Sequence, residues 1–259
     1  MKKIAFFLLV FFLLTTGCNR QEQATDKPGK ELLVYCGITM IKPMAEIGTM
    51  IEKQEGCKIT ITKGGSGNLL KAIRANMVGD LYLPGSDSYI ETSKKEGLVT
   101  ETVYVGQNKA VMMVRKNNPK GISPDLTNLL RKDLYVAVGN PNSGSIGRET
   151  KKVLERKNIF DGVIDNARIL TTDSKNLINV LKDEKADLVI NWYATATWPE
   201  NQPYVDVLPI ADKYATPKKL VIGLLKTSRY PEIARKFMAL AASKKGQDIF
   251  QKYGLYNVP

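Results

Sequence analysis

The sequence predicts an α/β protein of two lobes, each built on a mostly parallel sheet flanked by helices. Two observations carry this prediction. Short apolar runs that fit buried strands alternate with stretches of helical spacing along nearly the whole chain after residue 30. After Pro119 the alternation starts again, which indicates a second structural unit.

In the first half, each expected element has its own signal. Residues 32–36 form an apolar run between polar residues, typical of a buried parallel strand. Residues 58–62 alternate isoleucine and threonine, which is the clearest strand pattern of the chain. Helices are expected where apolar residues recur three and four apart, and Pro43 falls in a first turn, where proline is tolerated. The expected strands are 32–36, 58–62, 80–83 and 109–114, and the expected helices are 40–54, 68–76 and 88–97.

The second half repeats this order and adds a return toward the first lobe. Two extended segments, 111–114 and 205–210, are expected to cross between the lobes. We therefore assign residues 31–112 and 206–259 to lobe 1 and residues 113–205 to lobe 2. The expected helices are 125–130, 147–157, 176–182, 231–240 and 245–253, and the further strands are 134–138, 168–171, 186–191, 205–210 and 219–225.

Residues 1–18 have the pattern of a secretion signal. Lys2 and Lys3 precede an apolar run at 4–14, and small residues then lead to Cys18. As a helix the run rises only about 16 Å, roughly half of a bilayer's hydrocarbon core, so it is too short for an ordinary membrane span. The segment resembles a bacterial lipoprotein signal, which implies a signal peptide at 1–17, a lipid on Cys18 and a flexible tether at 18–30. We expect an extracytoplasmic protein that this lipid anchors to a membrane.

The composition excludes several classes of function. The formal net charge of +12 favours anionic partners. The lysines are scattered, however, and no nucleic-acid-binding motif is present, so nucleic acid is not an expected partner. The chain contains no histidine, which removes Ser-His-Asp and Cys-His catalysis and the usual zinc sites.

Two cysteines lie in the predicted folded body. Cys36 ends one expected strand and Cys57 opens the next. If these strands are parallel neighbours, the two residues lie at opposite ends of them and beyond the reach of a disulfide. We therefore expect two free thiols.

Four junctions between strands and helices are rich in glycine and hydroxyl side chains. Each would offer free backbone N–H groups and the positive end of a helix dipole, which together bind anions. Glycine lets the backbone approach a ligand closely because it has no Cβ. Serine, threonine and asparagine at any single junction also serve as ordinary helix caps, so the argument rests on their number. The four junctions are residues 36–40, 64–68, 140–147 and 171–176.

These loops and their flanks, over residues 32–255, resemble the periplasmic molybdate- and tungstate-binding proteins of ABC importers. The likeness is clearest near the C-terminus, at 223–228, 231–237 and 245–254, and it includes the serine-glycine loop 63–69 and the segment 186–195. It implies a type II periplasmic-binding-protein fold with the ligand cleft between the lobes. It also implies a monomer that binds a small oxyanion and works with a permease and its ATPase. Such a protein is not an enzyme, and it needs no cofactor or metal.

The same resemblance implies which residues bind the ligand. They are two hydroxyls in the first lobe, backbone and polar groups at two helix starts of the second lobe, and one tyrosine after a strand. The residues carried over are Thr39, Ser66, Ile146, Ser174, Asn176 and Tyr193.

Two departures from the family keep other functions open. Cys36 with Met40 and Met44 could bind a thiophilic species, since soft sulfur ligands select soft metals, although all three could equally pack in a core. Asp173 lies in a proposed ligand loop, where an inward carboxylate would repel a dianion. The alternatives are therefore another anion, a thiophilic ligand, or an exported enzyme that uses a pair such as Asp173 and Lys175.

Overall fold

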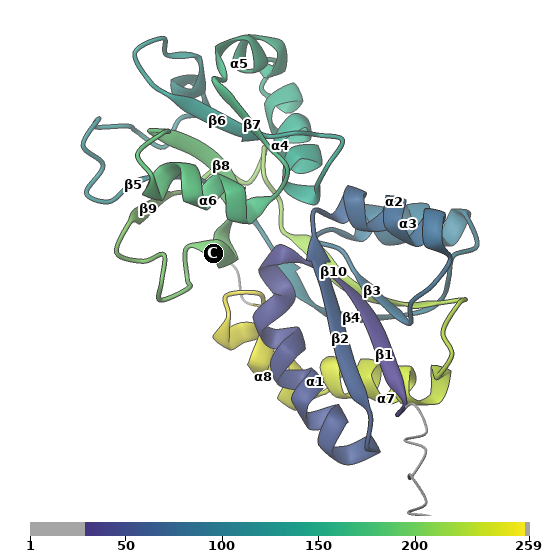
Figure 1. The fold of residues 1–259 in the computed structure, drawn as a ribbon. Coiled ribbons are helices and arrows are strands. Elements are labelled where there is room, and N and C mark those ends of the chain that lie inside the picture. Colours follow the sequence, from purple (N-terminus) through teal and green to yellow (C-terminus); the bar gives the residue numbers. More distant parts are fainter. Residues whose placement is uncertain (1–28, 257–259) are drawn as a thin grey trace, which may run out of the picture.

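The computed structural model of the protein describes residues 29–256 and shows two α/β lobes, each with a five-stranded sheet (Figure 1). The expected signal peptide at 1–17, Cys18 and most of the expected tether lie outside the described residues. Within residues 29–256, no helix is long and apolar enough to cross a membrane. The two-lobed α/β architecture expected from the alternating pattern is confirmed.

Lobe 1 contains the first half of the chain and its C-terminal part. Its sheet has the order β2-β1-β3-β10-β4, in which β1 is parallel to β2 and β3, and β10 is antiparallel to β3 and β4. Helices α1, α7 and α8 cover one face of the sheet, and α2 and α3 cover the other (Figure 1). The elements are β1 Glu31–Gly37, α1 Ile41–Glu55, β2 Lys58–Gly64, α2 Ser66–Asn76, β3 Leu81–Leu83, α3 Asp87–Lys95, β4 Val99–Asn108, β10 Lys218–Leu225, α7 Pro231–Ala242 and α8 Lys244–Lys252.

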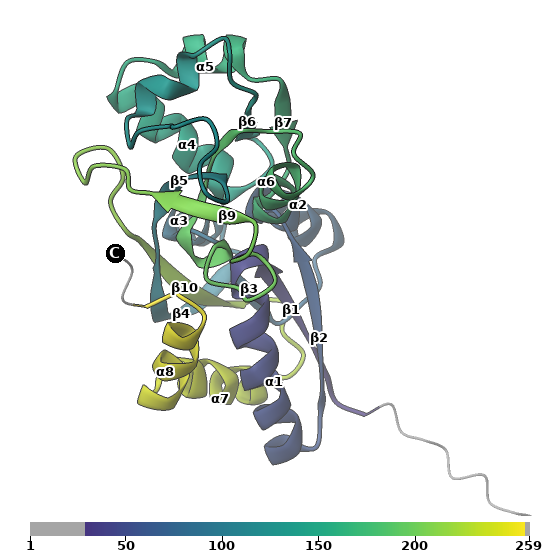
Figure 2. The same cartoon turned by 90° about the vertical axis from the view of Figure 1, so that its left-hand side faces the viewer.

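Lobe 2 has the same plan with the strand order β7-β6-β8-β5-β9. Its β6 is parallel to β7 and β8, whereas β5 is antiparallel to β8 and β9. Figure 2 shows lobe 2 above lobe 1, with α2 and α6 in the region between them. The elements are β5 Ala110–Arg115, η2 Leu126–Leu130, β6 Val136–Gly139, α4 Ser145–Arg156, α5 Phe160–Asn166, β7 Ile169–Thr171, α6 Ser174–Lys182, β8 Leu188–Trp192, η3 Tyr193–Thr195 and β9 Val205–Leu208.

The chain crosses between the lobes at places that differ slightly from the expected boundaries. It passes into lobe 2 at Lys109, between β4 and β5, and returns between β9 and β10. The segments 111–114 and 205–210 were expected as crossings. Residues 112–115 instead pair with 205–208 inside the lobe 2 sheet. The sheet pairing therefore places residues 110–112 and 206–208 in lobe 2.

Two elements were not expected from the sequence. The ten-residue strand β4 escaped because it pairs only with β10 and alternates loosely between buried and exposed residues. The seven-residue helix α5 is too short for a clear helical period. Cys36 and Cys57 are both free thiols, as expected. Parallel pairing aligns Cys36 with Lys63, at the far end of β2 from Cys57.

Candidate functional site

A small cavity lies where loops of the two lobes meet, at the carboxyl ends of the parallel strands. Its volume is about 10 Å³, which is close to the minimum for one water molecule. All four predicted junctions, each of which follows a strand, contribute residues to its lining. Lobe 1 contributes Gly37, Ile38, Thr39, Gly64, Gly65, Ser66 and Gly85, and lobe 2 contributes Gly144, Ser145, Ile146, Asp173, Ser174 and Trp192.

Three helices begin at this cavity with glycine as the N-cap residue. Gly37 precedes η1 (Ile38–Met40), Gly65 precedes α2 and Gly144 precedes α4. Most helices place a Ser, Thr, Asp or Asn at this position, whose side chain accepts a bond from the first turn. Glycine has no side chain to do so, so the first N–H groups of these helices stay available to a ligand. Helix starts from both lobes thus direct donors at one point.

The fourth helix start is different because it carries its own anion. Asp173 is the N-cap of α6, and its Oδ1 accepts bonds from the backbone N–H groups of Lys175 at 2.9 Å and Asn176 at 3.0 Å. Two amides of α6 are therefore already satisfied. Its carboxylate also adds negative charge to a cavity that is otherwise lined by neutral groups.

The polar side chains of the cavity are held in fixed orientations. The Oγ of Ser66 accepts a bond from the Gly85 N–H at 3.0 Å. The Oγ of Ser145 accepts one from the Trp192 Nε1–H at 3.2 Å. Since each oxygen already accepts a hydrogen bond, each hydroxyl proton is left to donate. Thr39 accepts a bond from Asn108 Nδ2 at 3.1 Å, while its own hydroxyl contacts the Met40 sulfur.

The structure brings together four of the six residues carried over from the resemblance: Thr39, Ser66, Ile146 and Ser174. Asn176 is exposed and bonds to Thr172 and Asp173 on its own helix start. Tyr193 packs against the lobe 2 core instead, and the preceding residue in the chain, Trp192, reaches the cavity.

Three cavity residues were not among the predicted ligand residues: Gly85, Trp192 and Ser145, although Ser145 lies in the predicted junction 140–147. Ser145 had a usable signal, because it stands directly before Ile146 at the first position of α4. Trp192 ends β8, and neighbouring residues of a strand face opposite sides of the sheet. Which of Trp192 and Tyr193 reaches the cavity therefore depends on the register of that strand. Gly85 follows the short strand β3 in a loop that had not been considered as a site.

Cys36 and Met40 belong to the lobe 1 core. Both side chains are fully buried among apolar neighbours, and burial raises the pKa of the Cys36 thiol far above its ordinary value. A thiol in that environment stays protonated and is a poor metal ligand. Among the residues described, those lining the cavity include neither side chain. This placement favours the core interpretation over the thiophilic site.

Comparison with known proteins assigns the family. The sequence pattern of a family described as bacterial extracellular solute-binding protein matches residues 32–256. The chain belongs to this family. A candidate ABC transporter substrate-binding lipoprotein of Bacillus subtilis, YvgL, is 25% identical over 260 residues, which cover 98% of each chain.

Two molybdate-binding proteins are also similar to this solute-binding protein. ModA of Mycobacterium tuberculosis is 21% identical over 252 residues, covering 95% of this chain and 94% of the relative. The periplasmic molybdate-binding protein of Azotobacter vinelandii superimposes with a TM-score of 0.72 at 16% identity, covering 88% of this chain and 99% of the other. These likenesses establish a two-lobed periplasmic-binding-protein fold.

The lobes of this solute-binding protein touch directly at the cavity. The backbone N–H of Asn68 in α2 donates to the carbonyl of Ser143 in lobe 2 at 3.1 Å. A Cβ on Gly65 would lie 2.5 Å from the Ser143 carbonyl oxygen and 2.7 Å from that of Thr172. Such distances are too short for real contacts, so glycine is required here for the lobes to meet.

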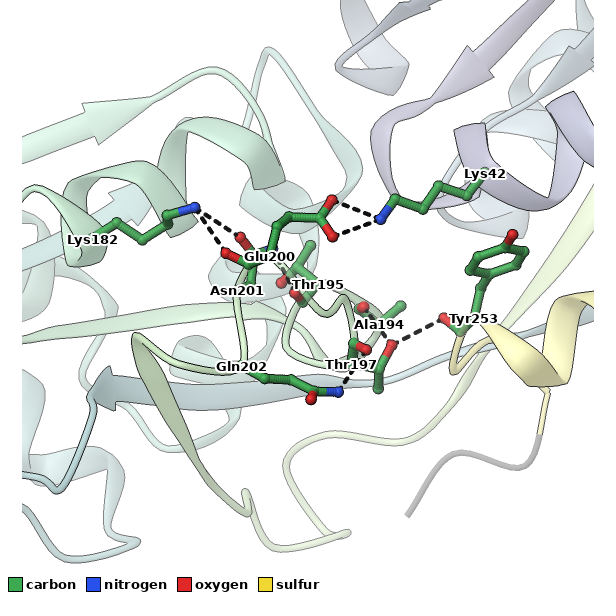
Figure 3. Close-up of polar contacts among 9 residues, drawn as sticks. All are labelled: Lys42, Lys182, Ala194, Thr195, Thr197, Glu200, Asn201, Gln202 and Tyr253. Atoms are coloured by element: carbon green, nitrogen blue, oxygen red, sulfur yellow. Dashed lines mark hydrogen bonds and ion pairs between the residues drawn. The ribbon is translucent and has the colours of Figure 1, made fainter.

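A second contact joins the lobes on the flank where α1 begins. Figure 3 shows Lys42, in the first turn of α1, facing Glu200 of the segment between β8 and β9. The Lys42 Nζ lies 2.6 and 2.8 Å from the two carboxylate oxygens. Nearby, the Thr197 hydroxyl donates to the Tyr253 carbonyl at 3.3 Å, which adds another link to lobe 1. The hydrogen bond from Lys42 lowers the pKa of Glu200.

We expect Gly65→Ala to weaken solute binding by about 10- to 100-fold. A new methyl group against two carbonyls makes the free energy of lobe closure less favourable by about 1–3 kcal/mol. Titration calorimetry measures the affinity, and thermal unfolding without solute should be unchanged. Gly48→Ala is the matched control, because Gly48 does not line the cavity and its Cβ would meet only the Ile59 side chain at 3.4 Å or more. Equal losses in both variants would contradict the role given to Gly65.

We expect Glu200→Gln to weaken solute binding by up to about fivefold, because an exposed ion pair contributes about 0.2–1 kcal/mol. Glu184→Gln is the control, since Glu184 pairs with Arg115 inside lobe 2. A similar loss in the control would show that the effect is not due to the contact between lobes.

The pH dependence of this contact follows from the lowered pKa of Glu200. A lowered carboxyl pKa means that the contact stabilises closure fully above the ordinary glutamate range, near pH 4.3, and is lost as pH falls through the lowered value. The affinity ratio of wild type to Glu200→Gln should therefore stay constant between about pH 5 and 8.

Proposed function

We propose that this solute-binding protein captures a small tetrahedral oxyanion, preferentially molybdate or tungstate, and presents it to the permease and ATPase of an ABC importer. The supporting observation is the convergence of three glycine-capped helix starts from two lobes on one cavity. The protein would act as a monomer and perform no chemistry on the ligand. Its likeness to two molybdate-binding proteins points to the same ligand class.

The physical basis is charge stabilisation by neutral donors. Each helix N-terminus carries about half of a positive elementary charge, and N–H groups converging from several sides replace the hydration shell of an anion. The overall charge of +12 also favours the approach of an anion. Fully ionised oxyanions have no proton to donate, so a ring of donors suits them.

The size of the cavity limits the ligand. With the lobes in contact the volume is about 10 Å³, so even a tetrahedral oxyanion requires the lobes to lie further apart than they do here. A large organic solute would hold them much further apart and would break the contact between Asn68 and Ser143. We therefore favour a compact ion, with entry when the lobes separate and retention when they close.

We also propose that the protein is held at an extracytoplasmic membrane surface by a lipid on Cys18, after removal of residues 1–17. The support is the N-terminal sequence pattern together with the similarity to a Bacillus subtilis protein whose name describes a lipoprotein. The tether at 18–30 would leave the lobes free to close and to reach a permease.

A second candidate ligand is favoured by one specific observation, the carboxylate of Asp173 at the cavity. A protonated oxyanion such as hydrogen phosphate can donate a hydrogen bond to a carboxylate, whereas molybdate cannot. Discrimination between the two classes therefore depends on Asp173.

The core position of Cys36 argues against the thiophilic alternative. An exported enzyme is not favoured, because the family that matches residues 32–256 is one of solute-binding proteins.

Titration calorimetry against molybdate, tungstate, sulfate, phosphate and arsenite tests the proposal. We expect the tightest binding with molybdate and tungstate, because the similar proteins described above bind molybdate. Sulfate is a smaller tetrahedral dianion, so its affinity separates the effect of size from that of charge. Tight binding of phosphate alone would select the second candidate. Binding of arsenite alone, abolished in Cys36→Ser, or of none of these anions, would refute oxyanion capture.

Asp173→Asn distinguishes the two oxyanion classes by the sign of its effect. Asparagine caps helices about as well as aspartate, so thermal stability should change little. Removing one negative charge near a dianion should strengthen molybdate binding by roughly tenfold. If the natural ligand instead donates a proton to Asp173, phosphate binding weakens, and that result would overturn the choice of molybdate.

A further inference from the structure

A second, larger hollow lies between the lobes, beside the first turn of α2. Its volume is about 590 Å³. We call it the basic groove, and define it by its four cationic side chains: Lys71 and Arg74 from α2 of lobe 1, and Arg148 and Lys151 from α4 of lobe 2. Among the residues that the structure describes, those lining this groove include no carboxylate. Figure 1 shows α4 lying above α2 and α3.

Arg148, one of the residues lining this groove, has two contacts with lobe 1. Its guanidinium carbon lies 3.5 Å from the centroid of the Tyr89 ring, which belongs to α3 of lobe 1. Its NH1 group also donates to the Ser88 Oγ at 3.3 Å. An arginine of lobe 2 is therefore held against lobe 1 by an aromatic face and a hydroxyl, and its charge is not neutralised by either.

The two flanks of the molecule differ in the charge that closure brings together. On the flank of α1, Lys42 meets Glu200, so closure joins opposite charges. On the flank of the basic groove, closure places two cations of each lobe around one hollow. Arg74 pairs with Glu96 and Lys151 with Glu155, each within its own lobe, which reduces the repulsion only in part. A negatively charged occupant would bind there and also favour closure.

We propose that the basic groove is a docking site for an acidic segment of the permease, and that it is complete only when the lobes are closed. This rests on the proposed function, because it assumes an importer as partner. The volume is many times that of the oxyanion cavity, and its cations lie on two helices, so an extended chain with several carboxylates fits better than one inorganic ion. Charge complementarity of this kind gives specificity and fast association.

The proposal gives the transporter a way to recognise the loaded protein. A segment that contacts α2 and α4 together binds the closed form more tightly than the open form. By linkage, the oxyanion and the acidic segment must then strengthen each other's binding by the same factor. A surface confined to one lobe would show no such coupling.

Fluorescence anisotropy with labelled hexaglutamate, at low salt, tests the groove. We expect hexaglutamate to bind the full chain, hexaglutamine not to bind, and saturating molybdate to strengthen the hexaglutamate interaction. The double variant Lys71→Gln, Lys151→Gln removes one groove cation from each lobe. It should weaken the binding of hexaglutamate by about tenfold. Lys53→Gln with Lys185→Gln is the matched control, since both lysines are exposed, one lies on each lobe, and neither lines the groove.

The outcomes separate this proposal from the proposed function. If hexaglutamate binding weakens equally in both double variants, the peptide is attracted to the basic surface in general. That result would overturn the proposal that the groove is a docking site. Peptide binding that is unchanged by molybdate, in a protein that calorimetry shows to bind molybdate, would also overturn it. Full displacement of the peptide by inorganic pyrophosphate at an equal concentration would assign the groove to a small polyanion instead. Failure to bind any oxyanion would contradict the proposed function itself.

Discussion

The site depends on backbone amides that the protein leaves without side-chain caps. Gly37, Gly65 and Gly144 each stand where a capping side chain usually satisfies the first turn of a helix. This leaves donors unsatisfied in the interior, which is costly unless something else accepts their hydrogen bonds. The same residues also allow close approach of the lobes, because a Cβ on Gly65 would strike two carbonyls of lobe 2. One residue choice therefore provides both the donors and the closure.

Closure connects the cavity with both flanks of the molecule. Thr39 lines the cavity, and Lys42 follows one turn later, so movement of the first loop also moves the partner of Glu200. On the other flank, α4 begins at the cavity with Ser145 and carries Arg148 in the same first turn. The rigid helices thus relay the position of the ligand loops to the surface. Under the proposed docking, a partner protein would distinguish the open from the closed form by contacting these surfaces.

The sequence predicted the fold better than the details of the site. Alternating strands and helices are a long-range pattern, and most elements appeared within a few residues of their expected bounds. The strand β4 was missed because its burial is set by β10, far away in the sequence. The choice between Trp192 and Tyr193 depended on strand register, which local sequence does not determine. The predicted crossings between the lobes were wrong because local sequence shows that a segment is a strand but not which sheet it joins.

Asp173 shows how a structural role and a binding role compete at one residue. As the cap of α6 it satisfies two amides, and it therefore stabilises a helix start that would otherwise offer those amides to a ligand. The cost is a negative charge beside the proposed oxyanion site. An asparagine would cap the helix without that charge, but it would lose the favourable interaction of a carboxylate with the helix dipole. We interpret the carboxylate either as a group that lowers the affinity for a dianion or as an acceptor for a protonated ligand. These two roles predict opposite signs for the change in ligand affinity that Asp173→Asn causes.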